Sequence, residues 1–170
     1  MAARTLIGAA QKGDLRKIKE FLNAGCNVSG RNTPGWYPLG GAVDQGHYQA
    51  VKLLVESGAR LNMQSTYGWT PLYTALDRGH IKIARYLLRC GAKPSIPTKD
   101  NTFGTSVKGD SALHIAVQSG NFRLVKALVR AGAKSTRLYG DSIVDEAVKL
   151  RQYKIACYLL QNNFKSRVKL

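Results

Sequence analysis

Histidine and cysteine are the residue types in this chain that could supply a catalytic base and a nucleophile. A base at His47 or His80 would need Cys90 or a serine as its nucleophile, and a metal site would need His, Cys or acidic residues at ligand spacing. The sequence contains no such spacing and no glycine-rich phosphate loop. We therefore predict that the chain is not an enzyme and that it uses no metal ion and no cofactor.

The segments that carry these residues recur with a fixed period. Leu6, Leu39 and Leu72 are each 33 residues apart, and two further copies follow around Leu113 and Val144. A period of this length is typical of a repeat array, whose core runs as a ribbon between neighbouring repeats. Five repeats are expected.

The best copy is Thr70-Pro71-Leu72-Tyr73-Thr74-Ala75, which matches the ankyrin signature Thr-Pro-Leu-His-x-Ala except at the histidine. Weaker copies begin at Tyr37, Ser111 and Ser142, so the chain resembles the ankyrin repeat family over nearly its whole length. The resemblance implies an all-α solenoid of stacked helix-turn-helix units with hairpin-like turns. It implies a single domain over residues 1–170, with repeats near 4–33, 34–66, 67–107, 108–138 and 139–170.

The same resemblance implies a structural role for the histidines. His47 and His80 follow glycines at a place where the ankyrin pattern has histidine, and His114 occupies the histidine of the signature. Thr70, Ser111 and Ser142 are expected to cap first helices. Glycines with positive φ are expected to end them, with Arg151 replacing glycine in the last repeat and Asn163 ending the repeat array. The glycines concerned are Gly13, Gly46, Gly79 and Gly120.

The second helix of each repeat is predicted to bury one apolar face, made of four columns of residues in register. The columns are Leu15, Tyr48, Ile81, Phe122 and Tyr153; Ile18, Val51, Ala84, Val125 and Ala156; Phe21, Leu54, Leu87, Leu128 and Leu159; and Leu22, Val55, Leu88, Val129 and Leu160.

The formal net charge of +16 points to an acidic partner only if the charge is clustered. In register, cations gather on the outward face of the second helices, where a solvated surface is the ordinary explanation. The alternative is that this face binds a polyanion such as nucleic acid or an acidic membrane surface, although it lacks interleaved exposed aromatic residues on which bases could stack. The cations are Arg16, Lys19, Lys52, Lys82, Arg85, Arg89, Arg123, Lys126, Arg130 and Lys154.

Ankyrin proteins usually bind partners through their concave face, at the turn tips and the exposed side of the first helices. Trp36 and Trp69 lie 33 residues apart on such tips, and Trp, Tyr and Arg are the residues that anchor interfaces. The other explanation is that the two indoles stack on each other and on the turn prolines. The predicted partner-binding residues are Trp36, Trp69, Tyr67, Tyr73, Asp44, Gln45, Asp77, Arg78, Gln118 and Tyr139.

The predicted function is therefore non-catalytic binding of another protein, as an adaptor, scaffold or inhibitor, by a monomer. Three cysteines without paired spacing favour a reducing compartment, the cytoplasm or alternatively the nucleus. No apolar run is long enough to span a membrane. The polar stretch 93–108 is predicted to form a long, mobile connection between the third and fourth repeats.

Overall fold

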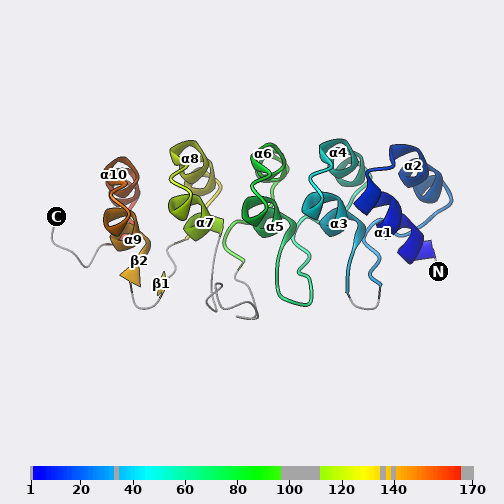
Figure 1. Ribbon diagram of the computed structural model, residues 1–170, viewed down its shortest axis with the longest axis horizontal. Coiled ribbons are helices and arrows are strands. Elements are labelled where there is room, and N and C mark those ends of the chain that lie inside the picture. The colour runs from blue at the N-terminus through cyan, green and yellow to red at the C-terminus, as the bar shows by residue number, and fades with distance from the viewer. Residues whose placement is uncertain (1, 33–34, 97–111, 135–136, 139–140, 166–170) are drawn as a thin grey trace. The chain divides into compact units, whose positions relative to one another are not determined.

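The computed structural model describes residues 2–32, 35–96, 112–134, 137–138 and 141–165. The described elements are ten α-helices and one short pair of strands. The chain divides into two compact units, Met1–Ala92 and Lys93–Leu170. Each unit is a series of helix pairs, as Figure 1 shows, which confirms the predicted all-α architecture of helix-turn-helix repeats.

The first unit contains three helix pairs. They are α1 (Ala2–Lys12) with α2 (Leu15–Asn23), α3 (Pro38–Asp44) with α4 (Tyr48–Glu56), and α5 (Pro71–Asp77) with α6 (Ile81–Arg89). First helices pack on first helices, α1 on α3 and α3 on α5, and second helices pack on second helices in the same order. The apolar core is therefore the layer between successive pairs.

The second unit contains two helix pairs and a hairpin. The pairs are α7 (Ala112–Gln118) with α8 (Phe122–Arg130) and α9 (Ile143–Lys149) with α10 (Tyr153–Gln161). Strands β1 (Arg137–Leu138) and β2 (Asp141–Ser142) pair antiparallel just before α9, with Arg137 opposite Ser142. This pairing agrees with the hairpin-like turn expected between repeats.

Capping residues set where the first helices begin. The Thr70 hydroxyl accepts a hydrogen bond from the Tyr73 amide at 3.2 Å, and Pro71 follows at the first helical position, where it needs no N–H partner. Ser142 and Asp145 form a reciprocal capping box at the start of α9. The predicted cap Ser111 lies outside the described residues.

A histidine joins the second repeat of the first unit to the first, and another joins the third to the second. The Nε2 atom of His47 lies 3.0 Å from the Gln11 carbonyl oxygen, and that of His80 lies 3.3 Å from the Asp44 carbonyl oxygen. A Cβ on Gly13 would come within 2.7 Å of the His47 ring, and the φ of Gly13 is +67°. Both facts require glycine here and support the structural role expected of His47 and His80.

The second helices bury two of the four predicted columns, together with one column that was not predicted. In the third predicted column, Phe21 is half-buried and the other four members are fully buried, at Leu54, Leu87, Leu128 and Leu159. The column from Ile18 to Ala156 is buried in every repeat, but Leu15 and Tyr153 of the first predicted column are 37% and 60% exposed. The fourth predicted column is half-buried throughout. The column that sequence reasoning missed is buried in four of the five repeats, at Ala50, Ile83, Leu124 and Ile155. Lys17 occupies the equivalent place in the first repeat and hides the pattern.

The predicted connection over residues 93–108 starts at the boundary between the two units, and most of it lies outside the described residues. At its described end, the Ser95 hydroxyl donates to the Gly132 carbonyl and accepts from the Lys134 amide. Arg151 and Asn163 adopt the left-handed conformation, with φ of 56° and 65°, as expected from their positions.

Candidate partner-binding site

Two turns of the first unit have the same backbone hydrogen bonds. In the turn before α3, the Asn32 amide donates to the Trp36 carbonyl at 3.0 Å, and in the turn before α5 the Ser65 amide donates to the Trp69 carbonyl at 2.9 Å. Side chains close the same loops, since the Trp36 amide donates to Asn32 Oδ1 and the Trp69 amide to Ser65 Oγ. The sequence period thus places each tryptophan as the last residue of its turn.

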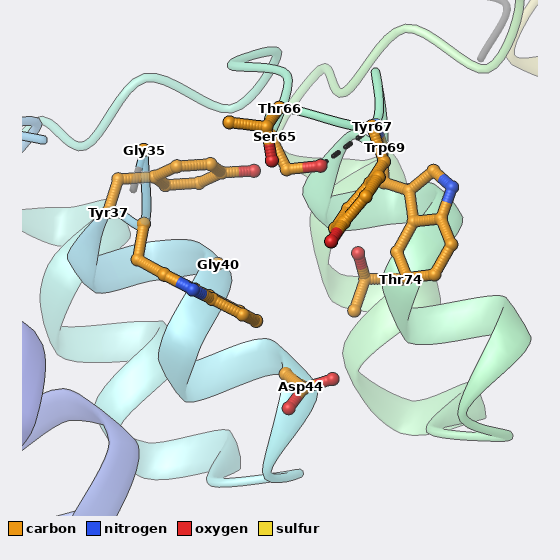
Figure 2. A pocket seen from close by; sticks show the side chains of 10 residues that line it. Gly35, Tyr37, Gly40, Asp44, Ser65, Thr66, Tyr67, Trp69 and Thr74 are labelled. Carbon is orange, nitrogen blue, oxygen red and sulfur yellow. Dashed lines mark hydrogen bonds between the residues drawn. The ribbon is translucent and has the colours of Figure 1, made fainter. Parts of the chain in front are cut away.

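A cavity of about 50 Å³ lies between these two turns and the first helices beneath them. Figure 2 shows Tyr37 on one side of it, Tyr67 and Trp69 on the other, and Asp44 below. Its surface is mostly apolar. The lining residues, which we call the aromatic pocket, are Gly35, Trp36, Tyr37, Gly40, Asp44, Ser65, Thr66, Tyr67, Trp69 and Thr74.

The two tryptophans have different surroundings. Trp36 is 39% exposed, and among the described residues no ring contact joins it to Trp69. Trp69 is half-buried between two tyrosines, with its ring 5.6 Å from that of Tyr67 and 5.8 Å from that of Tyr73. Trp36 therefore presents an open face at the pocket, whereas Trp69 also stiffens the third repeat.

The prediction that Tyr73 belongs to the exposed binding surface is wrong. Tyr73 is only 4% exposed, because it occupies the third position of α5 and packs under the Trp69 ring. Its effect on the surface is indirect, through the position of that indole. Tyr67, in contrast, is 38% exposed at the turn tip, as predicted.

Sequence reasoning missed Tyr37, which forms one wall of the aromatic pocket. Its hydroxyl donates to the Met63 carbonyl at 2.9 Å, and burial raises the pKa of this phenol far above its usual value. The Tyr37 ring lies so close to Gly40 that a Cβ there would approach it within 2.8 Å. The available signal was Tyr37-Pro38-Leu39-Gly40, in which a bulky ring replaces the capping threonine three residues before a glycine.

Asp44 lines the pocket at the C-terminal end of α3, where both of its carboxylate oxygens are occupied. Oδ1 pairs with Arg78 Nε at 2.9 Å, and Oδ2 accepts from Gln45 Nε2 at 2.8 Å. The Asp44 side chain is 15% exposed and that of Arg78 is 50% exposed. Asp44, Gln45 and Arg78, all predicted site residues, are therefore brought together beside the pocket.

The other predicted partner contacts do not join this cluster. Asp77 is exposed at the end of α5 but does not line the pocket. Gln118 belongs to the second unit, where its amide donates to Glu146 Oε1 at 3.1 Å. Tyr139 lies outside the described residues.

The ten predicted outward cations, six in the first unit and four in the second, are exposed except for the half-buried Lys126, and we use the name basic face for this set of residues. Half of them already contact groups of this chain. Arg16 pairs with Glu20 and Lys52 with Glu56 along their own helices, at 3.0 and 3.7 Å. Lys82, Arg89 and Lys154 lie over aromatic rings.

Aromatic rings do lie beside the basic face, but they are half-buried under its lysines, so they are not the exposed stacking surface whose absence was expected. The Lys82 ammonium lies 4.2 Å from the centre of the Tyr48 ring, and Lys154 lies 4.8 Å from that of Phe122. Tyr48 and Phe122 are the first residues of α4 and α8. The lysine over each ring is the second residue of the second helix in the following repeat, α6 or α10. Tyr48 also packs edge-on against Tyr86, as Phe122 does against Tyr158. These half-buried rings link neighbouring repeats, and their own lysines cover them.

Within the part of the chain that the structure describes, His, Cys, Asp and Glu side chains form no group that could hold a metal ion. The longest described helix has 11 residues, and none is suited by length and hydropathy to cross a membrane. The aromatic pocket contains one carboxylate, already paired, and no nucleophile beside a base. The surface that it offers is aromatic and mostly apolar.

The repeated helix pairs, the turns between them and the histidine links define a helical repeat protein. A family model for ankyrin repeats in three copies matches residues 6–100 and again residues 96–169. The chain belongs to the ankyrin repeat family, whose members generally act as protein interaction modules. No curated protein matches the chain.

Proposed function

We propose that this protein is a non-catalytic interaction module that binds a segment of another protein at the aromatic pocket, as an adaptor, scaffold or inhibitor. The observation that carries the proposal is the exposure of two large aromatic side chains around one apolar cavity. Trp36 is 39% and Tyr67 38% exposed, from neighbouring turns. Rigid aromatic side chains beside a pocket are typical anchors of protein interfaces.

The surroundings of the pocket also support a binding role. Tyr37 and Trp69, the less exposed walls, are fixed by a hydrogen bond to the Met63 carbonyl and by stacking on Tyr73. The pocket is therefore formed before a partner arrives, and little ordering of its walls is needed on binding. The exposed Trp36 and Tyr67 rings supply the area that a partner would cover.

The basic face has weaker support as a site for nucleic acid or an acidic membrane. Five of its ten cations already contact a carboxylate or a ring of this chain, and the rings that could stack with bases are covered by lysines. We assign this face mainly to holding neighbouring repeats together and to solvation.

The three cysteines are unpaired, and Cys90 and Cys157 are exposed. Exposed free thiols are typical of proteins that work in a reducing compartment. We therefore propose that the module works in the cytoplasm, with the nucleus as the alternative. We also propose that it works as a monomer.

The test is an affinity capture with the immobilised chain, followed by titration of the captured partner. Trp36→Ala should weaken binding by about thirtyfold, as expected for an anchor worth about 2 kcal/mol, and should leave the melting temperature nearly unchanged. Trp69→Ala should lower both the affinity for the partner and the melting temperature, because its ring stacks on Tyr67 and Tyr73. Tyr153→Ala is the matched control, since this tyrosine is 60% exposed on α10. A partner that binds the folded Trp36→Ala variant as tightly as the wild type would exclude the aromatic pocket.

A further inference from the structure

We propose that the aromatic pocket, in the binding role argued above, takes one large aliphatic or aromatic side chain from an acidic segment of the partner. The inference rests on that proposed function and adds the chemical class of the ligand. Its two parts, an apolar anchor and flanking carboxylates, come from different observations.

The apolar part follows from the lining of the pocket. Its walls are the rings of Trp36, Tyr37, Tyr67 and Trp69, and its one charged group is Asp44. A ring of aromatic residues with a carboxylate could also hold an alkylammonium ion by cation–π contact. Here, however, both oxygens of Asp44 are engaged, by Arg78 and Gln45, and the side chain is only 15% exposed. The Asp44 charge is already balanced by Arg78, so an ammonium would gain little from it and an uncharged side chain fits the pocket better.

The size of the pocket limits the ligand to one side chain. A cavity of about 50 Å³ has room for a few water molecules, each of which needs roughly 10–15 Å³ on this scale. The end of a leucine or phenylalanine side chain can replace these waters and bury apolar surface against the rings. The helix or strand that carries this side chain must stay outside, over Trp36 and Tyr67.

The acidic part follows from the charges beside the pocket. Arg31 is exposed, and its guanidinium lies 5.8 Å from the centre of the Tyr37 ring. The half-exposed Arg78 pairs with Asp44 through Nε, so these two charges balance and Arg31 supplies the net positive charge beside the pocket. The unit Met1–Ala92 carries twelve Lys and Arg against five Asp and Glu. Guanidinium groups pair well with carboxylates, so an acidic segment would be drawn to this surface and a basic one repelled.

The chain has an intrinsic reporter for the test, because its two tryptophans both line the pocket. Tryptophan fluorescence of the full chain would be titrated with four blocked pentapeptides. The first has leucine between two pairs of glutamates; in the second, alanine replaces the leucine; in the third, lysines replace the glutamates. The fourth has trimethyllysine in the middle of the glutamates.

We expect the acidic leucine peptide to bind at least tenfold more tightly than each of the other three. Arg31→Gln should weaken it about threefold and reduce its salt dependence, since a flanking charge is lost while the pocket is kept. Arg60→Gln is the matched control, an exposed arginine of the same unit that does not line the pocket.

Each other result overturns the inference. Equal binding of the leucine and alanine peptides removes the apolar anchor, and equal binding of the acidic and basic leucine peptides removes the acidic segment. Tightest binding of the trimethyllysine peptide makes the pocket a cation site, and no binding by any peptide excludes this ligand class. If the peptides fail while Trp36→Ala still abolishes capture of a protein partner, only the ligand class is wrong and the proposed function stands.

Discussion

His114 should make the second unit less stable in weak acid. The side chain is 1% exposed on α7, and burial lowers its pKa from 6.5 to about 4. In the unfolded chain the same imidazole is solvated and keeps its ordinary pKa near 6.5. Between pH 6.5 and pH 4, the unfolded state therefore binds a proton at His114 that the folded state does not.

The sign and size of the effect follow from this difference. Because the unfolded state binds more protons in this window, the free energy of unfolding falls as the pH is lowered from 6.5 to 4. A pKa difference of about 2.5 units corresponds to a total loss of about 3 kcal/mol, of which about 2 kcal/mol is lost by pH 5. Above pH 6.5 the contribution of His114 is complete and constant.

The assay is urea unfolding of the full chain at pH 7.5 and pH 5, followed by circular dichroism and by amide exchange in α7 and α8. His114→Gln should remove most of the pH dependence, whereas His47 and His80 remain in both proteins. If that variant does not fold, the ring resonance of His114 in the wild type should show no titration above pH 5. A resonance that titrates near pH 6.5, or equal stability of the wild type at both pH values, would refute the reasoning.

Three further predictions concern the backbone and the basic face. Arg151→Gly should raise the free energy of unfolding by about 0.5–1 kcal/mol, because Arg151 has a φ of 56° and glycine adopts this conformation without strain; thermal melts that show a loss would contradict it. Gly46→Ala should destabilise the first unit by at least about 1 kcal/mol more than Gly58→Ala in chemical unfolding. Both glycines have positive φ, but only at Gly46 would a Cβ meet a histidine ring, at 2.7 Å from His80. A single-stranded DNA of mixed sequence should bind the basic face more weakly than about 1 μM at about 0.15 M salt and without sequence preference, and tighter, selective binding in a fluorescence titration would revive the polyanion alternative.

The helices and turns could be predicted because residues within each repeat determine where they begin and end. Pro71 after a capping threonine, glycine at the end of a first helix and a 33-residue period each have a direct backbone meaning. Even Arg151, which breaks the glycine rule, adopts the conformation that its position requires. These features depend on neighbours within one repeat.

The buried face of the second helices could not be fixed in the same way. The apolar pattern of a helix does not determine, to within about one residue, which positions are buried. Packing against the neighbouring repeat determines them. Leu15 and Tyr153 are exposed, in the first and the fifth repeat of this sequence. Tyr48 and Phe122, in the same column, instead pack beside cations of the following repeat. Contacts between repeats therefore determine whether a residue of this column is buried in the core or packs beside a cation.

The aromatic pocket depends on the same kind of contact between repeats. This explains why the exposed residues at its rim, such as Trp36 and Tyr67, were predicted and its buried wall Tyr37 was not. Trp36 and Trp69 are equivalent in sequence and end turns with the same backbone hydrogen bonds, yet of these two only Trp69 has described rings on both sides, from Tyr67 and Tyr73. On the opposite side, Tyr37 replaces the threonine found at position 70 and its ring packs over Gly40. This substitution removes the hydroxyl that would cap α3 and adds an aromatic wall to the pocket. It therefore loses a capping hydrogen bond and forms a surface that the repeat pattern alone would not produce. A departure from the repeat beside a turn, combined with a compensating glycine, is therefore the sequence feature that marks the aromatic pocket.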